Sequence, residues 1–164
     1  MQPKNHHLAE LNIGRLLAPT DDPRVAEFMS ALDAINALAE RSDGFVWRLT
    51  GAGNNATDLA LAADDPQLVP NLSVWKNVAT LEHFVWNTVH RQFYERRAKW
   101  FEVLGKMHFA MWWVPAGHLP TLNEALGRLE HLRAHGDSAQ AFGWSYLRDA
   151  RLWRAKNCAG VAAE

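Results

Sequence analysis

Residues 77–114 read NVATLEHFVWNTVHRQFYERRAKWFEVLGKMHFAMWWV, and this stretch decides the fold. Asn77 is a suitable N-cap for a helix that begins at Val78. The helix then carries one apolar stripe with the spacing i, i+3, i+4, i+7 and i+8, formed by Leu81, Phe84, Val85, Thr88 and Val89. The apolar run from Phe109 to Val114 has the length of a buried strand. We therefore expect a long helix packed on a sheet at the centre of the fold.

The opposite side of the same helix carries side-chain types that bind planar or anionic ligands. They are His83, Trp86, Asn87 and His90, continued by Tyr94 and Arg97 if the helix persists. We take His90 as the candidate catalytic residue that moves a proton, and Arg97 as the candidate group that orients an anionic ligand. The alternative is a partly exposed face with structural histidines and a solvated run of arginines.

The segments on either side of this stretch predict alternating strands and helices. A strand over 7–17 precedes a helix that is capped by Asp22 and runs to Arg41. A second strand begins at Phe45, and a third begins at Asn71 after the long loop 51–70. With the central helix and the strand over 109–114, the order is β-α-β-β-α-β. This is the order of a ferredoxin-like α+β fold with a four-stranded antiparallel sheet.

The C-terminal part predicts one further helix. Thr121 caps a helix over 121–135, and Gly136 ends it. Ala141 begins a possible short edge strand, and the tail over 146–164 is either loosely held or one more helical turn. We expect residues 1–145 to form a single domain.

Several predicted strands are apolar on both faces, and in this topology helices cover only one face. We therefore expect a homodimer in which a second copy of the sheet covers the other face, as in a dimeric α/β barrel.

Composition excludes several classes of function. The formal charge of −1 provides no basic surface for nucleic acid, and no apolar run is long enough to span a membrane. The N-terminus lacks the apolar core of a signal peptide, so we expect a cytoplasmic protein. The single cysteine, Cys158, cannot form an internal disulfide and has no activating neighbour beyond Lys156. His131 and His135 lack an acidic or cysteine companion, so we predict no metal site.

Three segments resemble an uncharacterised bacterial domain family. They are HRQFYERRAKWF (90–101), WWVPAGHLPTLNEALGRLEHLRAHG (112–136) and AFGW (141–144). The resemblance covers roughly residues 7–145. The family looks like a branch of the dimeric α/β-barrel superfamily, which includes antibiotic-biosynthesis monooxygenases, heme-degrading monooxygenases, muconolactone isomerases and chlorite-dismutase-like proteins. The resemblance implies a pocket between the sheet and the helices, and it implies no particular reaction.

Strand residues complete the predicted site. Strand alternation places Glu10, Asn12, Arg48 and Ser73 on one face, where Glu10 and Arg48 could form an ion pair. Heme-degrading members use a strand Asn, a Trp and a helix His, which suggests Asn12, Trp75 and either His83 or His90. The predicted substrate-binding residues are Asn12, Trp75, His83, Trp86, Tyr94, Trp112, Trp113 and His118. Trp112 and Trp113 should point to opposite faces of the sheet.

We expect an enzyme of the monooxygenase or isomerase type that needs no cofactor and acts on a hydrophobic, anionic small molecule. The loop 51–70 is a predicted lid. Two alternatives stay open: a non-catalytic ligand-binding or assembly dimer, and a heme-binding or heme-degrading protein.

Overall fold

The computed structural model describes residues 1–59, 61–62 and 65–158, with side chains described as far as residue 155. In this part of the chain, four strands form an open sheet in the order β2-β3-β1-β4, and all neighbours are antiparallel. The strands are β1 (His6–Arg15), β2 (Phe45–Arg48), β3 (Leu68–Trp75) and β4 (Phe109–Pro115). The predicted α+β class and four-stranded antiparallel sheet are confirmed.

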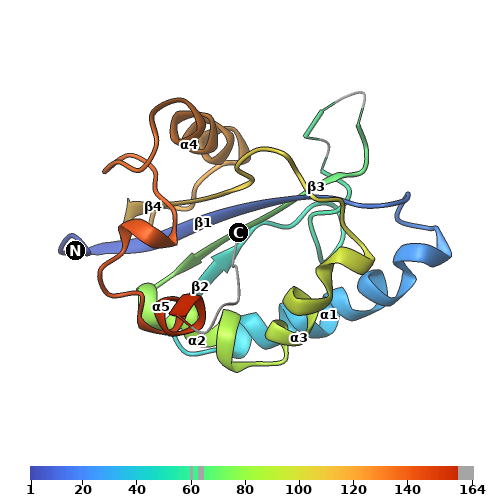
Figure 1. Ribbon diagram of the computed structural model, residues 1–164, viewed down its shortest axis with the longest axis horizontal. Helices are drawn as coiled ribbons and strands as arrows, with labels where there is room; N and C mark the ends of the chain where they lie inside the picture. The colour runs from blue at the N-terminus through green and yellow to red at the C-terminus, as the bar shows by residue number, and fades with distance from the viewer. Residues whose placement is uncertain (60, 63–64, 159–164) are drawn as a thin grey trace.

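Helices lie on both sides of the sheet. The α-helices described are α1 (Ala26–Arg41), α2 (Val78–Asn87), α3 (His90–Arg96), α4 (Leu122–His135) and α5 (Arg151–Cys158). Short 3-10 helices are η1 (Pro23–Val25), η2 (Arg97–Lys99) and η3 (Trp144–Tyr146). Figure 1 shows α1, α2, α3 and α5 on one side of the sheet and α4 on the other. We call these the four-helix side, which Leu8 of β1 faces, and the α4 side, which Leu11 faces.

Two of the three predicted helix caps lie on the α-helices assigned to them, and the third caps a shorter element. The side chain of Asp22 accepts a hydrogen bond from the backbone N–H of Arg24 and caps η1, whereas α1 begins after Val25 without a side-chain cap. Asn77 caps α2 by accepting from the N–H of Thr80 at 3.0 Å. Thr121 accepts from the N–H of Glu124 at 3.1 Å, and Gly136 ends α4 with a positive φ of 71°. Each cap satisfies a backbone group that the helix itself leaves unpaired.

The central helix does not persist to Arg97, which was the condition for Tyr94 and Arg97 to continue its face. Thr88 has extended backbone, and its hydroxyl donates to the carbonyl of Phe84 at 2.6 Å. The same hydroxyl accepts from the N–H of His90 at 3.2 Å. The side chain of Thr88 thus replaces the helical hydrogen bonds at this point, so α2 ends and α3 begins in a new direction. Tyr94 and Arg97 therefore do not continue the face of α2.

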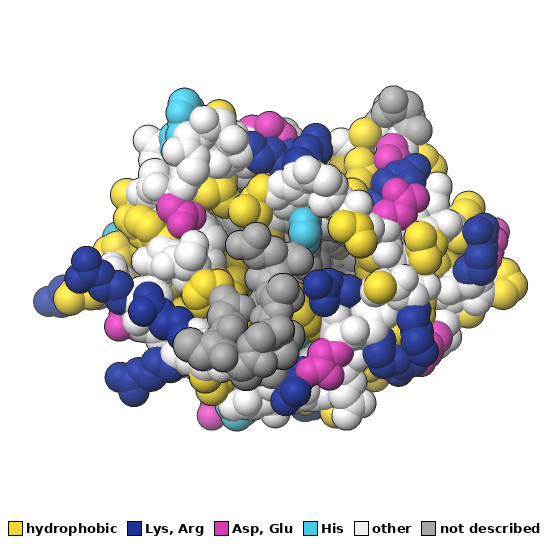
Figure 2. Space-filling model, viewed as in Figure 1, with side chains coloured by type: hydrophobic (Ala, Val, Ile, Leu, Met, Phe, Trp, Pro, Cys, Tyr) yellow, Lys and Arg dark blue, Asp and Glu magenta, His cyan; other side chains and the backbone are white. Residues whose placement is uncertain are grey.

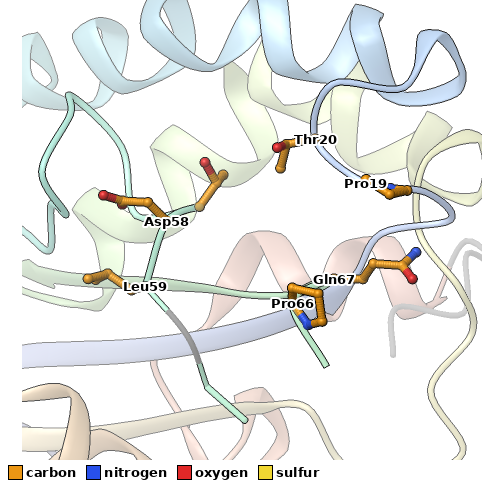
Figure 3. Close-up of a pocket in the computed structure, with 7 residues that line it drawn as sticks. Pro19, Thr20, Asp58, Leu59, Pro66 and Gln67 are labelled. Atoms are coloured by element: carbon orange, nitrogen blue, oxygen red, sulfur yellow. The ribbon is translucent and has the colours of Figure 1, made fainter. Parts of the chain in front are cut away.

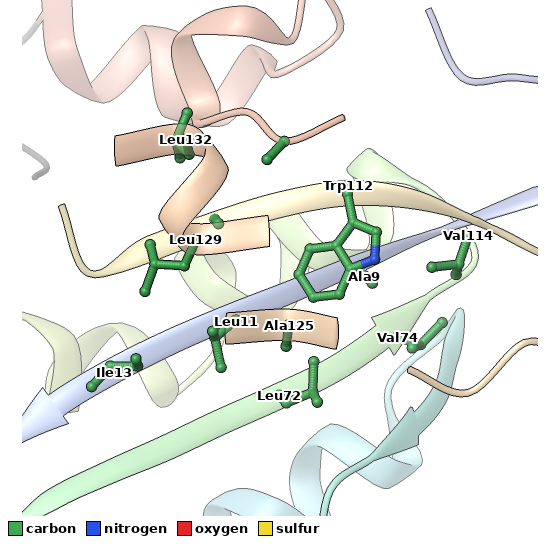
Figure 4. Close-up of a cluster of buried hydrophobic side chains, with 12 residues drawn as sticks. Ala9, Leu11, Ile13, Leu72, Val74, Trp112, Val114, Ala125, Leu129 and Leu132 are labelled. Atoms are coloured by element: carbon green, nitrogen blue, oxygen red, sulfur yellow. The ribbon is translucent and has the colours of Figure 1, made fainter. Parts of the chain in front are cut away.

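The α4 side of the sheet is covered in part by the chain itself, a result that the sequence did not predict. Side chains from α4 pack on β1, β3 and β4 to form the α4 cluster (Figure 4). The buried members include Ala9, Leu11, Leu72, Trp112, Val114, Ala125, Leu129 and Leu132. Val46, Trp47 and Leu49, in and just after β2, are only half-buried against this cluster. A second copy of the chain is therefore not needed over β1 and β4.

The predicted edge strand from Ala141 is reduced to one bridge. Phe142 exchanges two backbone hydrogen bonds with Met111, at 2.8 and 2.9 Å. The carboxylate of Asp137 then accepts from the N–H of Gly143 and the hydroxyl of Ser145, which turns the chain into η3. The pairing with β4 ends because this turn directs the chain away from the strand.

The C-terminal tail includes α5, in agreement with the helical alternative. The carboxylate of Glu82 in α2 is buried and accepts from the backbone N–H groups of Arg151 at 3.1 Å and Trp153 at 2.9 Å. Glu82 thereby holds the first turn of α5 against α2. The side chain of Cys158 lies outside the described residues.

Charged side chains are unevenly placed on the face shown in Figure 2, with several Lys and Arg side chains toward its left edge. Figure 2 shows basic and acidic side chains next to one another on its right-hand part. Among the described residues, no helix combines the length and the apolar character required to cross a membrane.

Candidate functional site

On the four-helix side, polar residues separate two apolar clusters. The α2 cluster includes Leu8 of β1 and Trp75 of β3, and the α3 cluster includes Leu16 and Val69 near the other ends of the same strands. The sheet positions between the clusters are polar. We call them the polar strip, which consists of Glu10, Asn12, Arg48, Asn71 and Ser73.

Strand pairing brings the polar strip together. Glu10 lies opposite Ser73, and Ser73 lies opposite Arg48 on its other side. Asn12 lies opposite Asn71. Because side chains alternate along a strand, all five face the four-helix side, together with Leu8 and Trp75. The prediction that Glu10, Asn12, Arg48 and Ser73 share one face is confirmed.

Glu10 is the buried ionisable group of the strip. It is 5% exposed, and its carboxylate accepts a hydrogen bond from the hydroxyl of Ser73 at 2.6 Å. That hydroxyl accepts in turn from the indole N–H of Trp75 at 2.8 Å. Burial raises the pKa of Glu10 to about 7, and the hydrogen bond from Ser73 opposes the rise. Glu10 can therefore accept and release a proton near neutral pH.

The predicted ion pair between Glu10 and Arg48 does not form. The guanidinium of Arg48 lies 2.8 Å from the carboxylate of Glu40 in α1 and donates to the side-chain oxygen of Asn54 at 2.9 Å. The strand order accounts for this difference, because β3 lies between β1 and β2 and Ser73 separates the two charges. The positive charge of Arg48 is thus balanced by α1, and Glu10 has no ion-pair partner among the described residues.

Asn12 and Asn71 form the more accessible end of the strip. Asn12 is half-buried and Asn71 is exposed. Their side chains lie on directly opposed positions of β1 and β3, and neither amide makes a hydrogen bond within the described part of the chain. The N–H groups of both side chains can therefore donate hydrogen bonds to a ligand, and their carbonyl oxygens can accept them.

One apolar side chain of α1 lies between the residues that this helix packs into the two clusters. Phe28 packs into the α3 cluster and Ile35 into the α2 cluster. Leu32 lies between them on the same face of the helix, is half-buried, and belongs to neither cluster of described residues. Core packing therefore does not fully bury Leu32, and part of its apolar surface stays accessible.

His90 lies at the α2 cluster, at the start of α3. Its ring contacts Phe84, with 4.8 Å between ring centroids, and Phe84 stacks on Trp75 at 5.1 Å. Its Nδ1 lies 3.4 Å from the carbonyl oxygen of Val85. Burial lowers the pKa of His90, and the contact with Val85 opposes the decrease. Burial therefore favours the neutral form of the imidazole.

Trp86, Tyr94 and Arg97 come together at a separate place. The rings of Trp86 and Tyr94 meet edge to face at 5.1 Å, and the guanidinium of Arg97 lies 4.2 Å from the centroid of Tyr94. Arg97 also donates to the carbonyl oxygen of Tyr94 at 3.0 Å. A shallow depression of about 440 Å³ adjoins this group, lined by Trp86, Asn87, Thr88, Arg91, Gln92 and Glu95.

The remaining predicted site residues are dispersed. His83 is exposed on α2. Trp112 is fully buried in the α4 cluster and Trp113 lies half-buried on the four-helix side, which confirms that their side chains point to opposite faces. His118 is exposed in the loop before α4, 2.7 Å from the carboxylate of Glu124. The predicted residues therefore do not form a single site.

The loop predicted as a lid is attached to α1 beside the polar strip. The side-chain amide of Asn54 accepts a hydrogen bond from Arg48 and donates one to the carboxylate of Asp33 at 3.2 Å. The backbone carbonyl of Asn54 accepts from the side chain of Asn36 at 3.4 Å. Further along the loop, an open pocket of about 240 Å³ lies against the turn before α1 (Figure 3). It is lined by Pro19, Thr20, Thr57, Asp58, Leu59, Pro66 and Gln67. The role as a lid stays a prediction.

Sequence reasoning did not select Glu10 or Asn71 as site residues. The available signal was an acidic side chain in an apolar strand and an asparagine in the run NLSVW. Both are polar positions on strands whose neighbours are buried, and such positions are enriched at functional sites.

The described residues contain no group of three or more metal-ligating side chains. Residues 7–158 match the model of a family described as "Domain of unknown function (DUF3291)". None of the curated proteins matches the chain.

Two solved structures are similar to this chain. Protein SO0527 from Shewanella oneidensis has 10% identity and a TM-score of 0.49, over 68% of this chain and 93% of its own. Protein PA3566 from Pseudomonas aeruginosa has 17% identity and a TM-score of 0.44, over 70% of this chain and 95% of its own.

Proposed function

The chain belongs to the DUF3291 family, and we propose that it is a small-molecule enzyme of the isomerase or cofactor-independent monooxygenase type, in which Glu10 transfers a proton. The observation that carries this proposal is the polar strip between two apolar clusters on the four-helix side. A strip of this kind costs folding stability, because polar groups there displace apolar packing. We infer that these polar side chains serve to bind a ligand, which would explain why apolar residues do not occupy the same positions.

Glu10 is the best candidate for the proton carrier. Its pKa of about 7 provides both protonation states near neutral pH, and Ser73 orients the carboxylate. The ring of His90, which contacts Phe84 beside Trp75, is a second candidate at the α2-cluster end. The proposed substrate is a hydrophobic small molecule that packs against Leu32 and reaches the strip through Asn12 and Asn71.

Deuterium exchange tests the proposal without knowledge of the natural substrate. A panel of carbon acids, including ketones, 1,3-diketones and nitroalkanes, would be incubated with the protein in D2O, and the loss of C–H signals would be followed by NMR. We expect catalysed exchange of at least one class, with a rate that rises with pH through about 7 as Glu10 ionises.

Two variants locate the activity. Glu10→Gln keeps the size of the side chain and should abolish exchange, whereas Glu130→Gln, on an exposed position of α4, should leave it unchanged. Folding of both would be checked by thermal unfolding. If wild type exchanges no compound, the enzyme proposal is overturned and the non-catalytic ligand-binding alternative replaces it. A Soret band in the purified protein would instead support the heme alternative.

We further propose that the fold is ferredoxin-like and that two copies pair through the part of the α4 side that α4 leaves uncovered. The strand order β2-β3-β1-β4 supports the first part, and half-buried Val46, Trp47 and Leu49 support the second. An apolar surface of this kind is typical of an interface. Sedimentation at micromolar concentration should report a dimer, and Trp47→Ser should shift it toward monomer. A monomeric wild type would contradict the assembly.

A further inference from the structure

We propose that the substrate is a neutral carbonyl compound with an acidic C–H bond, whose oxygen is held by the side-chain amides of Asn12 and Asn71 while Glu10 removes the proton. This inference rests on the proposed function and names its substrate class. It proposes a neutral substrate in place of the anionic one expected from the sequence.

The spacing of the strip suits this arrangement. Asn12 and Asn71 are directly opposed, so their Cβ atoms lie about 5 Å apart, close enough for both amides to reach one oxygen atom. Glu10 lies two residues from Asn12 on the same strand face, a separation of about 7 Å. A carbonyl group and its α-carbon span this separation once a hydrogen bond is added at each end.

The hydrogen-bonding state of the strip also fits. Both amides are without partners in the described part of the chain, whereas Glu10 and Ser73 are already bonded to each other. The free N–H donors therefore lie at the accessible end, and the base lies at the buried end. A ligand bound here would hold its carbonyl oxygen at the accessible end and direct its C–H bond inward, toward Glu10.

The charges on the strip disfavour an anion. The guanidinium of Arg48 is paired with Glu40, and the guanidinium of Arg97 is packed on Tyr94. A carboxylate on the substrate would instead face ionised Glu10 without a compensating cation from the strip. A neutral carbonyl avoids this repulsion and becomes negative only when the proton has moved to Glu10.

The reaction step needs no oxidant or cofactor. The carboxylate of Glu10 takes the proton from the α-carbon as the C–H bond breaks, and the electron pair moves onto the carbonyl oxygen to form an enolate. The N–H groups of Asn12 and Asn71 donate to this oxygen, where charge develops. If the proton on Glu10 is replaced by a solvent deuteron, transfer of that deuteron to the same carbon gives exchange, whereas transfer of the proton to a conjugated carbon gives isomerisation.

The first test uses the exchange assay. Carbonyl compounds should exchange faster than nitroalkanes of similar acidity, and Asn12→Leu and Asn71→Leu should each slow carbonyl exchange about tenfold or more while Glu10 stays intact. If exchange depends on Glu10 but is unchanged in both asparagine variants, the substrate inference is overturned and the proposed function stands.

The second test uses binding and does not require turnover. The probe is 4-nitrophenol, whose phenolate form resembles an enolate and whose absorbance reports its ionisation. Glu10→Gln should bind the phenolate more tightly than wild type, because the competing carboxylate is removed. Adding Asn12→Leu or Asn71→Leu to Glu10→Gln should weaken binding about tenfold.

Asn123→Leu, an exposed position on α4, is the matched control and should not change the affinity. Absence of binding to Glu10→Gln, or equal affinity in the asparagine variants, would overturn the inference whatever the outcome of the exchange assay. Thermal unfolding of each variant confirms that a loss of binding is not a loss of fold.

Discussion

The two sides of one sheet differ sharply in this protein. On the α4 side, Leu11 and Leu72 are opposed on β1 and β3 and are fully buried under α4. One residue further along, on the four-helix side, the same strands present Asn12 and Asn71, whose amides have no partner in the described part of the chain. On the α4 side, β1 and β3 present buried apolar side chains, whereas on the four-helix side the centre of the sheet carries polar side chains between two apolar clusters. This difference is the reason why we propose the four-helix side as the functional one.

The largest expected effect lies on the α4 side. Leu129→Ala should lower the free energy of unfolding by about 2–5 kcal/mol, because Leu129 is fully buried and its loss leaves a cavity beneath α4. Urea unfolding measures the change. Leu119→Ala, at a position 48% exposed, is the control and should change stability by about 0.5 kcal/mol or less. If both variants lower the free energy of unfolding by the same small amount, α4 does not bury this side of the sheet.

The next effect concerns the pH dependence that Glu10 produces. Its pKa is raised in the folded state from 4.5 to about 7, so the neutral form is favoured by folding. The protonated form of Glu10 makes its full contribution to the free energy of unfolding below pH 4.5, and this contribution is lost as the pH rises through about 7. The loss is on the order of 3 kcal/mol.

Urea unfolding of wild type and Glu10→Gln between pH 4 and 8 measures this contribution as a difference. We expect the stability of wild type to fall relative to the variant as pH rises. Parallel curves would mean that Glu10 is not perturbed, and the contrast between the two sides of the sheet would lose its main support.

A smaller effect is expected at Ser73. Ser73→Ala removes the hydroxyl that donates to Glu10 and accepts from Trp75, which should cost about 1–2 kcal/mol. Because this hydrogen bond lowers the pKa of Glu10, its removal should raise that pKa further. Carbon-13 NMR of the glutamate carboxyl groups measures the shift. Ser30→Ala, exposed on α1, should leave both quantities unchanged.

The smallest expected change in stability is at Asn12. Asn12→Leu removes an amide that has no partner among the described residues, so the free energy of unfolding should change by about 0.5 kcal/mol or less. Thermal unfolding measures it. A loss of more than about 2 kcal/mol would show that Asn12 is a structural residue, which contradicts its proposed role in binding.

Local sequence signals predicted most of the elements. Asn77 and Thr121 cap the helices assigned to them, and Asp22 caps η1, the 3-10 helix directly before α1. The alternation of Trp112 and Trp113 was predicted correctly. The candidate site was predicted less well. His90, Trp86 and Arg97 share one stripe only if the helix is continuous, and the hydroxyl of Thr88 interrupts it. A periodic pattern contains no information on such a competing side-chain hydrogen bond.

The sequence by itself determined the elements of this protein, because caps, periodicity and strand alternation act over a few neighbouring residues. Only the tertiary structure decided that α4 lies on the opposite side from the other helices, that Arg48 pairs with Glu40, and that Asn12 meets Asn71. These outcomes depend on strand register and on which surfaces pack together. The energies that select them come from contacts between segments far apart in the chain, so the partners of the strip residues are decided only in the folded sheet.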